Sequence, residues 1–286
     1  GAEVVMASDP DADRIGLVIR DNNGEYVLIN GNQIVMIFLN YLMTRNTELG
    51  TLTGNEYIVK TIVTTETIRT IAEAQHIKMY DCFTGFKWIA NVMRENEGKA
   101  RYLGGGEESY GFLAEDFVRD KDSVSAISLM AEIAAWAKDK GLNMTDMLID
   151  IYMKYGFLRE KGISLVRKGK SGAEEIIALM KQFRENPPKE IAGSPVVTVK
   201  DFQSLVETNV ATGETKKLDM PATSNVLQYY TADRTKVSVR PSGTEPKIKF
   251  YIEVHDTLAS ADEYKATEAR ADEKINRIAK EFGITK

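Results

Sequence analysis

Short β-rich runs and helical patterns alternate along residues 31–158, and this alternation restricts the possible folds more than any other feature of the sequence. In the last helical pattern, apolar residues such as Val124, Ile127 and Ala131 share one face. Strands that alternate with helices are typical of a parallel, doubly wound sheet. We therefore predict an α/β domain over residues 31–158. Its expected elements are a helix at 33–44, a strand at 57–62, a helix at 66–75, a strand at 77–80, a helix at 87–95, a strand at 100–103 and a helix at 124–138.

Residues 1–30 hold three short β-rich runs, near residues 4–7, 15–19 and 26–29, around an acidic loop. A segment of about thirty residues is too small to fold well alone. The chain also lacks an initiator methionine and opens almost directly into an apolar run. We therefore expect this segment to be the remnant of an α/β domain that was cut from a larger protein.

Residues 159–286 follow another order, in which one early helix precedes several strands and a final helix. This order is typical of an α+β domain. We predict such a domain, smaller than the doubly wound one, over residues 159–286. Its expected elements are a strand at 163–166, a helix at 173–184, strands near 196–199, 226–230, 236–239 and 248–254, and a helix at 261–280.

Composition narrows the class of partner. The 286 residues, 43% of them hydrophobic, can form more than one core, because domains typically hold roughly 100–200 residues. The net charge of −5 argues against a broad nucleic-acid surface, and no apolar run approaches the ~20 residues of a membrane span. A single cysteine, Cys82, and the absence of a secretory signal suit a reducing compartment. We predict a cytoplasmic protein that binds small molecules, and neither nucleic acid nor membranes.

The acidic loop at residues 8–14 carries three aspartates, Asp9, Asp11 and Asp13, at alternate positions. Carboxylates spaced in this way can converge on one hard cation and leave room for an outside oxygen in an octahedral Mg²⁺ shell. An EF-hand would need Gly where Arg14 stands and Glu six positions later, so that interpretation fails. A solvated acidic turn is disfavoured because the like charges repel one another. We predict a Mg²⁺ site, and hence that residues 1–30 are the remnant of a metal-binding domain.

A second loop, at residues 104–111, combines three glycines with Glu107, Glu108 and Ser109. The glycines would suit a tight turn at the ligand-binding end of a parallel sheet. Two glutamates would repel phosphate, whereas carboxylate and hydroxyl oxygens suit sugar hydroxyls. We expect a sugar-binding loop, with an ordinary acidic loop as the alternative.

Three further polar clusters could meet an anionic ligand. The segments 84–87 and 119–122 each place a lysine between regular elements, although each could also be a surface charge cluster. Residues 240–249 join two expected strands and combine the planar donors of Arg240 with hydroxyls and a glycine. Such a set of donors indicates phosphate binding, while a plain hairpin loop is the alternative.

In four loops, taken in chain order, the sequence resembles the α-D-phosphohexomutases of the phosphoglucomutase/phosphomannomutase type. The loops are DPDADR at 9–14, TGFK at 84–87, GEES at 106–109 and RPSGT at 240–244. The match spans essentially the whole chain. The resemblance implies a four-domain enzyme in which successive domains carry a phosphoserine, the metal loop, the sugar-binding loop and the phosphate-binding loop.

The resemblance also implies a role for each matching residue. Mg²⁺ would be held by Asp9, Asp11 and Asp13. The catalytic residues would be Arg14, Lys87 and Lys121. The substrate would be bound by Thr84, Glu107, Ser109, Arg240, Ser242, Gly243, Thr244 and Lys249.

The implied reaction interconverts hexose 1-phosphate and hexose 6-phosphate, of glucose, mannose or both. An enzyme phosphoserine would give its phosphoryl group to the sugar phosphate. The resulting hexose bisphosphate would then turn around and return its other phosphoryl group to the serine. The family's Ser-His-Asn-Pro motif is absent, since neither His76 nor His255 lies beside a suitable serine. We therefore expect this chain to lack the N-terminal phosphoserine domain and to bind ligand with little turnover. It also has Ser123 where many relatives have Gly.

Two alternatives from other classes stay open. A metal-dependent sugar phosphatase of the haloacid-dehalogenase kind would use Asp9 as nucleophile and Asp11 as acid/base. That family prefers Thr or Val at the position that Asp13 occupies. A non-catalytic sugar-phosphate-binding module is the second alternative.

Overall fold

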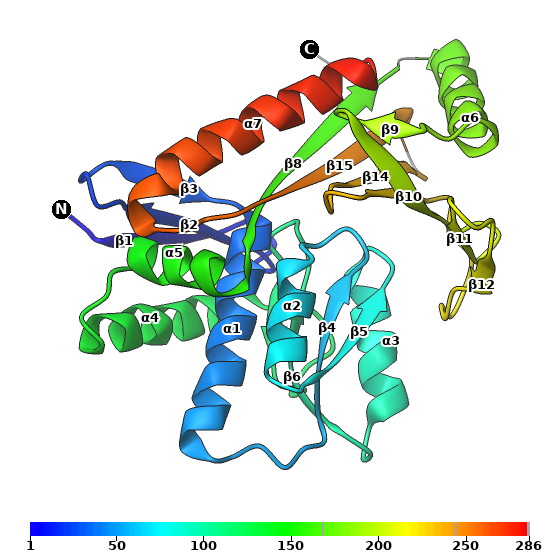
Figure 1. Ribbon diagram of the computed structural model, residues 1–286. Coiled ribbons are helices and arrows are strands. Elements are labelled where there is room, and N and C mark those ends of the chain that lie inside the picture. The colour runs from blue at the N-terminus through cyan, green and yellow to red at the C-terminus, as the bar shows by residue number, and fades with distance from the viewer. Residues whose placement is uncertain (168, 244, 285–286) are drawn as a thin grey trace. The chain divides into compact units, whose positions relative to one another are not determined.

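The computed structural model describes residues 1–167, 169–243 and 245–284 (Figure 1). These residues form two compact units. Unit 1 contains Gly1–Phe157 with Leu258–Asp262, and unit 2 contains Leu158–Thr257 with the residues from Glu263 on. None of the helices in the described ranges has an apolar stretch long enough to cross a bilayer.

The first sheet of unit 1 is antiparallel, with strands β1 (Val4–Ser8), β2 (Ile15–Arg20) and β3 (Tyr26–Ile29) in that order. Alternate residues of β2, beginning with Ile15, are almost fully buried, which is the pattern of a strand with one face in a core. The β1–β2 connection holds the three aspartates. A strand pair therefore fixes both ends of the predicted metal loop.

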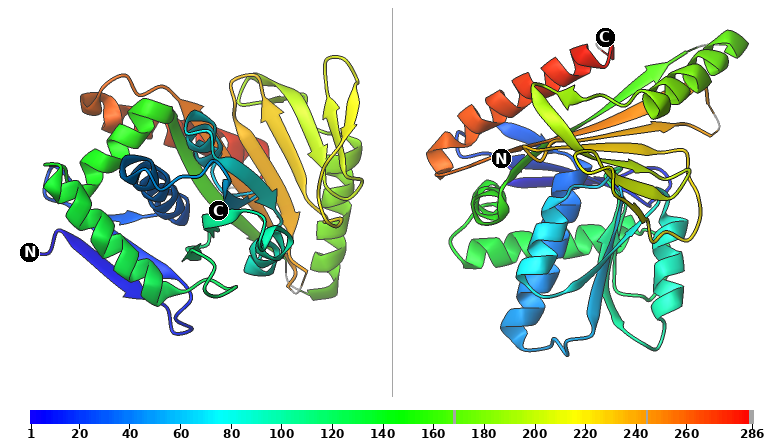
Figure 2. Two further views of the ribbon diagram at one scale, coloured as in Figure 1. Left: turned by 90° about the horizontal axis from the view of Figure 1, so that it is seen from below. Right: turned by 45° about the vertical axis from the view of Figure 1, so that its right-hand side comes forward.

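The second sheet of unit 1 has the order β5-β4-β6-β7, and β4 pairs in parallel with both β5 and β6. Helices α1 and α2 lie on one side of this sheet and α3 on the other, as Figure 2 shows for α1 and α3. The predicted doubly wound α/β domain is thus confirmed, with one antiparallel strand, β7, added at the edge. The elements are α1 (Gly31–Leu49), β4 (Glu56–Thr61), α2 (Thr67–Ala74), β5 (Lys78–Cys82), α3 (Phe86–Asn96), β6 (Arg101–Gly106) and β7 (Phe112–Ala114).

Residues Gly104–Gly106 were predicted to form a tight turn, and that prediction is wrong because they form the buried end of β6. Glycine is required at these positions because neighbouring atoms leave no space for a side chain. A Cβ at Gly105 would lie 2.7 Å from the Val59 carbonyl oxygen, and one at Gly106 would lie 2.7 Å from Val35 Cγ2. The absence of side chains therefore lets β4 and α1 pack tightly against this strand.

Two helices, α4 (Ser123–Asp139) and α5 (Met144–Tyr155), cover the first sheet. The Asp122 side chain caps α4 by accepting from the Val124 and Ser125 N–H groups. Asn143 and Asp146 form a capping box at the start of α5. The sequence did not predict α5, because most of its residues are buried around its circumference and leave no one-sided apolar stripe.

Unit 2 contains a sheet with the order β12-β11-β10-β13-β14-β15-β8, to which β9 adds beside β10. Its pairings from β12 to β15 are antiparallel. Helices α6 and α7 pack on it, and Phe183, Phe250 and Phe282 meet between the sheet and these helices. The predicted α+β class is confirmed. The elements are β8 (Phe157–Val166), α6 (Gly169–Glu185), β9 (Glu190–Ile191), β10 (Ser194–Asp201), β11 (Val206–Asn209), β12 (Thr215–Lys217), β13 (Leu227–Thr231), β14 (Lys236–Pro241), β15 (Lys247–Asp256), a 3-10 turn (Ala261–Glu263) and α7 (Tyr264–Glu281).

Candidate functional site

The carboxyl ends of β5 and β6 bring two of the predicted ligand loops of unit 1 together. Both strands run parallel to β4, so their ends meet at one edge of the sheet. Thr84 and Gly85 follow β5, and Glu107 follows β6. The Gly85 N–H donates to Glu107 Oε1 over 2.6 Å. Gly85 has φ +108°, a conformation that glycine adopts readily, so this residue can turn its N–H toward the carboxylate.

Glu107 is only 6% exposed. Burial raises the pKa of its carboxyl group above the ordinary value of 4.5, although the Gly85 hydrogen bond and the positive charge of Lys121 act in the opposite direction. A buried carboxylate that keeps a free oxygen for a ligand costs stability. Such a residue is typical of a binding site rather than of a core.

Glutamine at position 107 should stabilise unit 1. Because the raised pKa makes the folded state bind the proton more tightly than the unfolded chain does, the free energy of unfolding falls as pH rises above 4.5. The Glu107→Gln variant should lose this decline and be more stable at pH 7 by about 1 kcal/mol. Denaturant unfolding at pH 5 and pH 7, followed by the fluorescence of Trp88 and Trp136, would test it. Equal pH dependence in both proteins would contradict it.

The aspartate loop is folded around Asp9. Its Oδ1 accepts from the backbone N–H groups of Asp13 and Arg14, each over 3.1 Å. Desolvation alone would raise the pKa of Asp9, but these two hydrogen bonds lower it below its ordinary value. Ala12 lies in the left-handed region with φ +58°, which brings the ends of the loop together. Asp9 therefore shapes the loop and stays ionised.

Asp13 faces two cations. Its Oδ2 lies 2.8 Å from Lys121 Nζ, and its Oδ1 lies 3.5 Å from Arg14 Nε. Burial disfavours the charged form of Lys121, but its ion pairs with Asp13 and Asp120 outweigh this, so the pKa of Lys121 is raised. A Cβ at Gly111 would lie 2.6 Å from Lys121 Cδ, so Gly111 leaves the space that the lysine needs. The aspartate loop and the 119–122 loop thus share one cluster of charges.

The donor chemistry of the aspartate loop fits Mg²⁺. Asp13 Oδ1 is buried and accepts no hydrogen bond, and Asp11 is exposed and forms no hydrogen bond or ion pair within the described part of the chain. Carboxylate oxygens are the ligands that Mg²⁺ prefers. However, the described residues contain no group of three His, Cys, Asp or Glu side chains already gathered as ligands. The Mg²⁺ site stays a prediction.

The structure gives less for Lys87 and Ser109. Lys87 is exposed in the first turn of α3, and its Nζ lies 5.5 Å from the centre of the Trp88 ring. Ser109 is half-buried beside Glu108, and Thr84 is half-buried before Gly85. Their predicted ligand roles stay predictions.

In unit 2, the predicted phosphate-binding residues lie on the β14–β15 hairpin. Arg240 and Lys249 are directly opposite each other on the two strands. Their neighbours Val239 and Ile248 are buried on the other face. The Ser242 N–H donates to the Lys247 carbonyl over 2.8 Å and closes the turn. Gly243 is exposed in that turn, and Thr244 lies outside the described residues.

Arg240 and Lys249 form a pair of like charges. Neither side chain has an ion-pair or hydrogen-bond partner among the residues that the structure describes. Like charges directly opposite on neighbouring strands destabilise a sheet unless an anion offsets them. This side of the hairpin is therefore suited to bind an anion.

Sequence reasoning missed two groups of this region. Ser8 and Ser123 share a hydrogen bond of 2.6 Å between their hydroxyls, and the Ser123 N–H donates to the Ala12 carbonyl. Position 123, noted as a departure from relatives, thus contacts the aspartate loop. The second group is Glu108 with Thr61 and Thr64. Glu108 was part of the predicted sugar-binding loop, but the threonine-rich run that starts at the end of β4 was the only signal of its partners.

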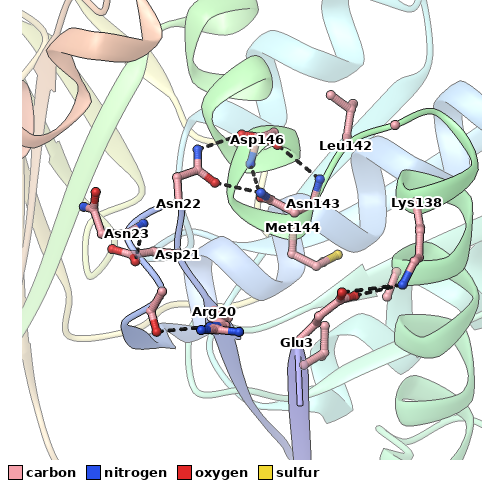
Figure 3. A pocket seen from close by; sticks show the side chains of 14 residues that line it. Glu3, Arg20, Asp21, Asn22, Asn23, Lys138, Leu142, Asn143, Met144 and Asp146 are labelled. Atoms are coloured by element: carbon pink, nitrogen blue, oxygen red, sulfur yellow. Dashed lines mark hydrogen bonds and ion pairs between the residues drawn. The ribbon is translucent and has the colours of Figure 1, made fainter. Parts of the chain in front are cut away.

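A separate hollow of about 850 Å³ in unit 1 lies between the β2–β3 turn and the start of α5 (Figure 3). Its polar side chains bind one another. Asn22 Nδ2 donates to Asp146 Oδ1 over 2.8 Å, and Asn143 Nδ2 donates to Asn22 Oδ1 over 2.7 Å. None of the predicted site residues lines it. These hydrogen bonds connect the β2–β3 turn to the start of α5.

Comparison with known families decides what kind of protein carries this site. Residues 30–155 match the family model for phosphoglucomutase/phosphomannomutase, alpha/beta/alpha domain III. Residues 184–271 match the model for the C-terminal domain of the same family. The chain belongs to the phosphoglucomutase/phosphomannomutase family. The resemblance inferred from four loops is thereby confirmed.

Curated members of the phosphoglucomutase/phosphomannomutase family support the assignment. The chain is 36% identical over 251 residues to a phosphoglucomutase of Staphylococcus epidermidis, which covers 88% of this chain and 45% of that protein. It is 35% identical to a phosphoglucomutase of Staphylococcus aureus MRSA252, over 88% of this chain and 44% of that protein. The chain thus spans about half the length of these relatives.

Solved structures share the fold. The open form of pp63/parafusin, a phosphoglucomutase from Paramecium, matches with a TM-score of 0.63 at 18% identity over 97% of this chain and 46% of that one. A putative phosphomannomutase from Thermus thermophilus matches with a TM-score of 0.57 at 16% identity, over 96% of this chain and 46% of that one.

The two family models divide the predicted site. Glu107 and Lys121 fall within the domain III match, and Arg240 and Lys249 fall within the C-terminal match. The aspartate loop at residues 9–14 precedes both. The predicted domain boundaries at 30/31 and 158/159 stay predictions.

Proposed function

We propose that this chain is part of a phosphohexomutase that interconverts hexose 1-phosphate and hexose 6-phosphate, most simply of glucose. The observation that carries the proposal is the buried Glu107 carboxylate, held by Gly85 in a loop cluster that also contains the Asp13–Lys121 ion pair. Unit 1 thus offers an acceptor for sugar hydroxyls next to cations for a phosphoryl group. Unit 2 offers an anion site. A hexose phosphate carries both kinds of group.

In unit 1, Glu107 and Ser109 would bind the sugar hydroxyls, with Thr84 and Lys87 beside them. Asp9, Asp11 and Asp13 would hold Mg²⁺, which when bound would withdraw negative charge from the transferring phosphoryl group. Arg14 and Lys121 would stabilise the same charge from the protein side, and fixed charges of this kind supply much of phosphoryl-transfer catalysis.

The phosphoryl donor would be a phosphoserine on a domain that precedes the aspartate loop. Its Oγ–P bond would break as a bond forms from phosphorus to a hydroxyl oxygen of the hexose monophosphate. That hydroxyl would lose its proton and the freed serine oxygen would gain one, so the serine would end as a hydroxyl. The hexose bisphosphate would then turn and return its other phosphoryl group to the serine. In each half of the cycle one phosphoryl group moves between the serine and the sugar. One hexose monophosphate is therefore converted to the other without hydrolysis.

The test of this function is mutase turnover by the protein that the complete reading frame of this chain encodes. Glucose 1-phosphate with a trace of glucose 1,6-bisphosphate should yield glucose 6-phosphate. Release of inorganic phosphate instead would favour the phosphatase alternative. Binding of glucose 1-phosphate with neither product would leave the chain a binding module and overturn the proposal.

In unit 2, Arg240, Ser242, Gly243, Thr244 and Lys249 would bind the phosphate that is not being transferred. The two cations without protein partners among the described residues are the support for this assignment. Charge-assisted hydrogen bonds from a guanidinium to a phosphate are among the stronger polar contacts.

Alanine at position 240 should weaken anion binding. We expect the Arg240→Ala variant to bind inorganic phosphate and glucose 1-phosphate at least about tenfold more weakly, because one charge-assisted contact contributes about 1.5–3 kcal/mol. Isothermal titration calorimetry on the chain would measure both. Arg277→Ala, which removes an exposed arginine of the same unit, is the matched control. Unchanged phosphate affinity in Arg240→Ala would refute the hairpin assignment.

A further inference from the structure

Four charged side chains pair with one another near the ligand edge of the unit 1 sheet. Lys60, in β4, is 0% exposed, and its Nζ lies 2.9 Å from Asp81 Oδ1 and 3.0 Å from Glu66 Oε1. Arg69, in α2, pairs with the other oxygen of both carboxylates. Two cations and two anions therefore alternate, and the group is neutral. We call it the ion-pair ring.

The ion-pair ring links three elements at their ligand ends. Lys60 comes from β4, Glu66 from the β4–α2 turn and Asp81 from the end of β5. Lys60 Nζ also donates to the backbone carbonyls of Thr61 and Thr64, each over 3.4 Å. The ring therefore sets the path of the β4–α2 turn.

The hydroxyls of the same two threonines point to the sugar-binding loop. Thr61 Oγ1 and Thr64 Oγ1 lie 2.8 Å apart, and Glu108 Oε2 lies 3.2 and 3.4 Å from them, so the two hydroxyl protons can link the three oxygens with Glu108 as acceptor. Both threonines are 0% exposed, so these contacts do not compete with bulk water. The backbone of Glu108 is confined as well, since a Cβ at Gly31 would lie 2.0 Å from its carbonyl oxygen.

Glu107 and Glu108 are thus held from different strands. Glu107 Oε1 accepts from Gly85 after β5, and Glu108 Oε2 accepts from the threonines at and just after the end of β4. The ion-pair ring joins the ends of those two strands. A peptide held at two successive side chains has little freedom to rotate, and a preset site loses less entropy when a ligand binds.

We propose that Glu108 is a positioning residue, fixed by Thr61 and Thr64 on the ion-pair ring, that presets the Glu107–Ser109 peptide for sugar hydroxyls. The part of this inference that concerns the sugar rests on the proposed function. Glu108 itself touches no reacting atom. It acts through the orientation of its neighbours.

The first measurement needs no ligand. Hydrogen exchange of the segment 103–113 in the 286-residue chain should be about fivefold faster in Glu108→Ala and in the double variant Thr61→Val/Thr64→Val, because loss of one net hydrogen bond of about 1 kcal/mol opens the loop more often. Glu108→Gln keeps an acceptor oxygen and should exchange like the wild type. Thr65→Val is the matched control, because Thr65 is equally buried in the same turn and its hydroxyl contacts Thr67 instead.

The second measurement compares two probes. Glucose 1-phosphate should bind about tenfold more weakly to Glu108→Ala, whereas inorganic phosphate should bind as it does to the wild type. A variant that is merely destabilised would not change this ratio. Glu108→Gln should restore affinity to within about threefold of the wild type.

The two measurements separate the possible failures. If the wild-type chain does not bind glucose 1-phosphate, the proposed function falls, while hydrogen exchange still decides the positioning role. If segment 103–113 exchanges equally in Glu108→Ala and the wild type, or equally fast in Thr65→Val and the double variant, the positioning role is wrong. It is equally wrong if Glu108→Gln behaves like Glu108→Ala.

Discussion

The Asp11→Asn variant should lose Mg²⁺-dependent mutase turnover by about three orders of magnitude, the scale of several kcal/mol that a bound metal ion contributes to phosphoryl transfer. Asp11 is exposed and forms no hydrogen bond or ion pair with the described residues, so the substitution removes the proposed metal ligand and little else. The effect would be measured as mutase turnover by the protein that the complete reading frame encodes, and as the Mg²⁺ affinity of the chain in a titration.

Asp219→Asn is a matched control for Asp11→Asn, since Asp219 is also exposed and forms no hydrogen bond or ion pair with the described residues. Its Mg²⁺ affinity and turnover should equal those of the wild type. Asp13 is the less suitable position, because its loss would also leave Lys121 without its closest anion. Full activity and Mg²⁺ affinity in Asp11→Asn would show that the aspartate loop is no metal site.

The fold was largely predictable because its elements have clear periods. The strand β2 alternates buried with at least partly exposed residues, and α3 carries a one-sided apolar stripe, so both were predicted near their observed bounds. The helix α5 lacks such a stripe, and the short strands β11 and β12 carry too few buried residues to show alternation. The strand at Gly104–Gly106 was missed because glycine occurs both in turns and where elements pack closely. The sequence alone does not show which neighbours, here β4 and α1, approach these glycines.

The candidate site was predictable where chemistry is local in sequence. The aspartate loop and the Arg240 hairpin each hold their polar side chains within about ten residues. Their composition alone therefore indicated a cation at the aspartate loop and an anion at the hairpin. The contacts of Glu107 with Gly85 and of Asp13 with Lys121 join residues 22 and 108 positions apart. Only strand order creates such contacts. The ion-pair ring is of this kind, since a lone lysine inside a β-rich run gives no sign that two acidic residues will surround it.

Removal of Lys60 should have the largest effect on the stability of unit 1. The Lys60→Met variant keeps most of the side-chain volume but removes the ion pairs of Lys60 with Glu66 and Asp81, whose pairs with Arg69 remain. Removing one partner of a buried ion pair leaves charges without compensation, and we expect a loss of about 3 kcal/mol in the free energy of unfolding. Both tryptophans of the chain, Trp88 and Trp136, lie in unit 1, so urea unfolding followed by their fluorescence reports on this unit.

The same substitution at the surface is the control for Lys60→Met. Lys138 pairs with Glu3 over 3.2 Å in unit 1, but both side chains are about 70% exposed. Water and ions already screen such a pair, so Lys138→Met should change the free energy of unfolding by no more than about 0.5 kcal/mol. Similar losses in the two variants would mean that the ion-pair ring is no stronger than a surface pair. In that case it could not fix the β4–α2 turn against which Glu108 rests.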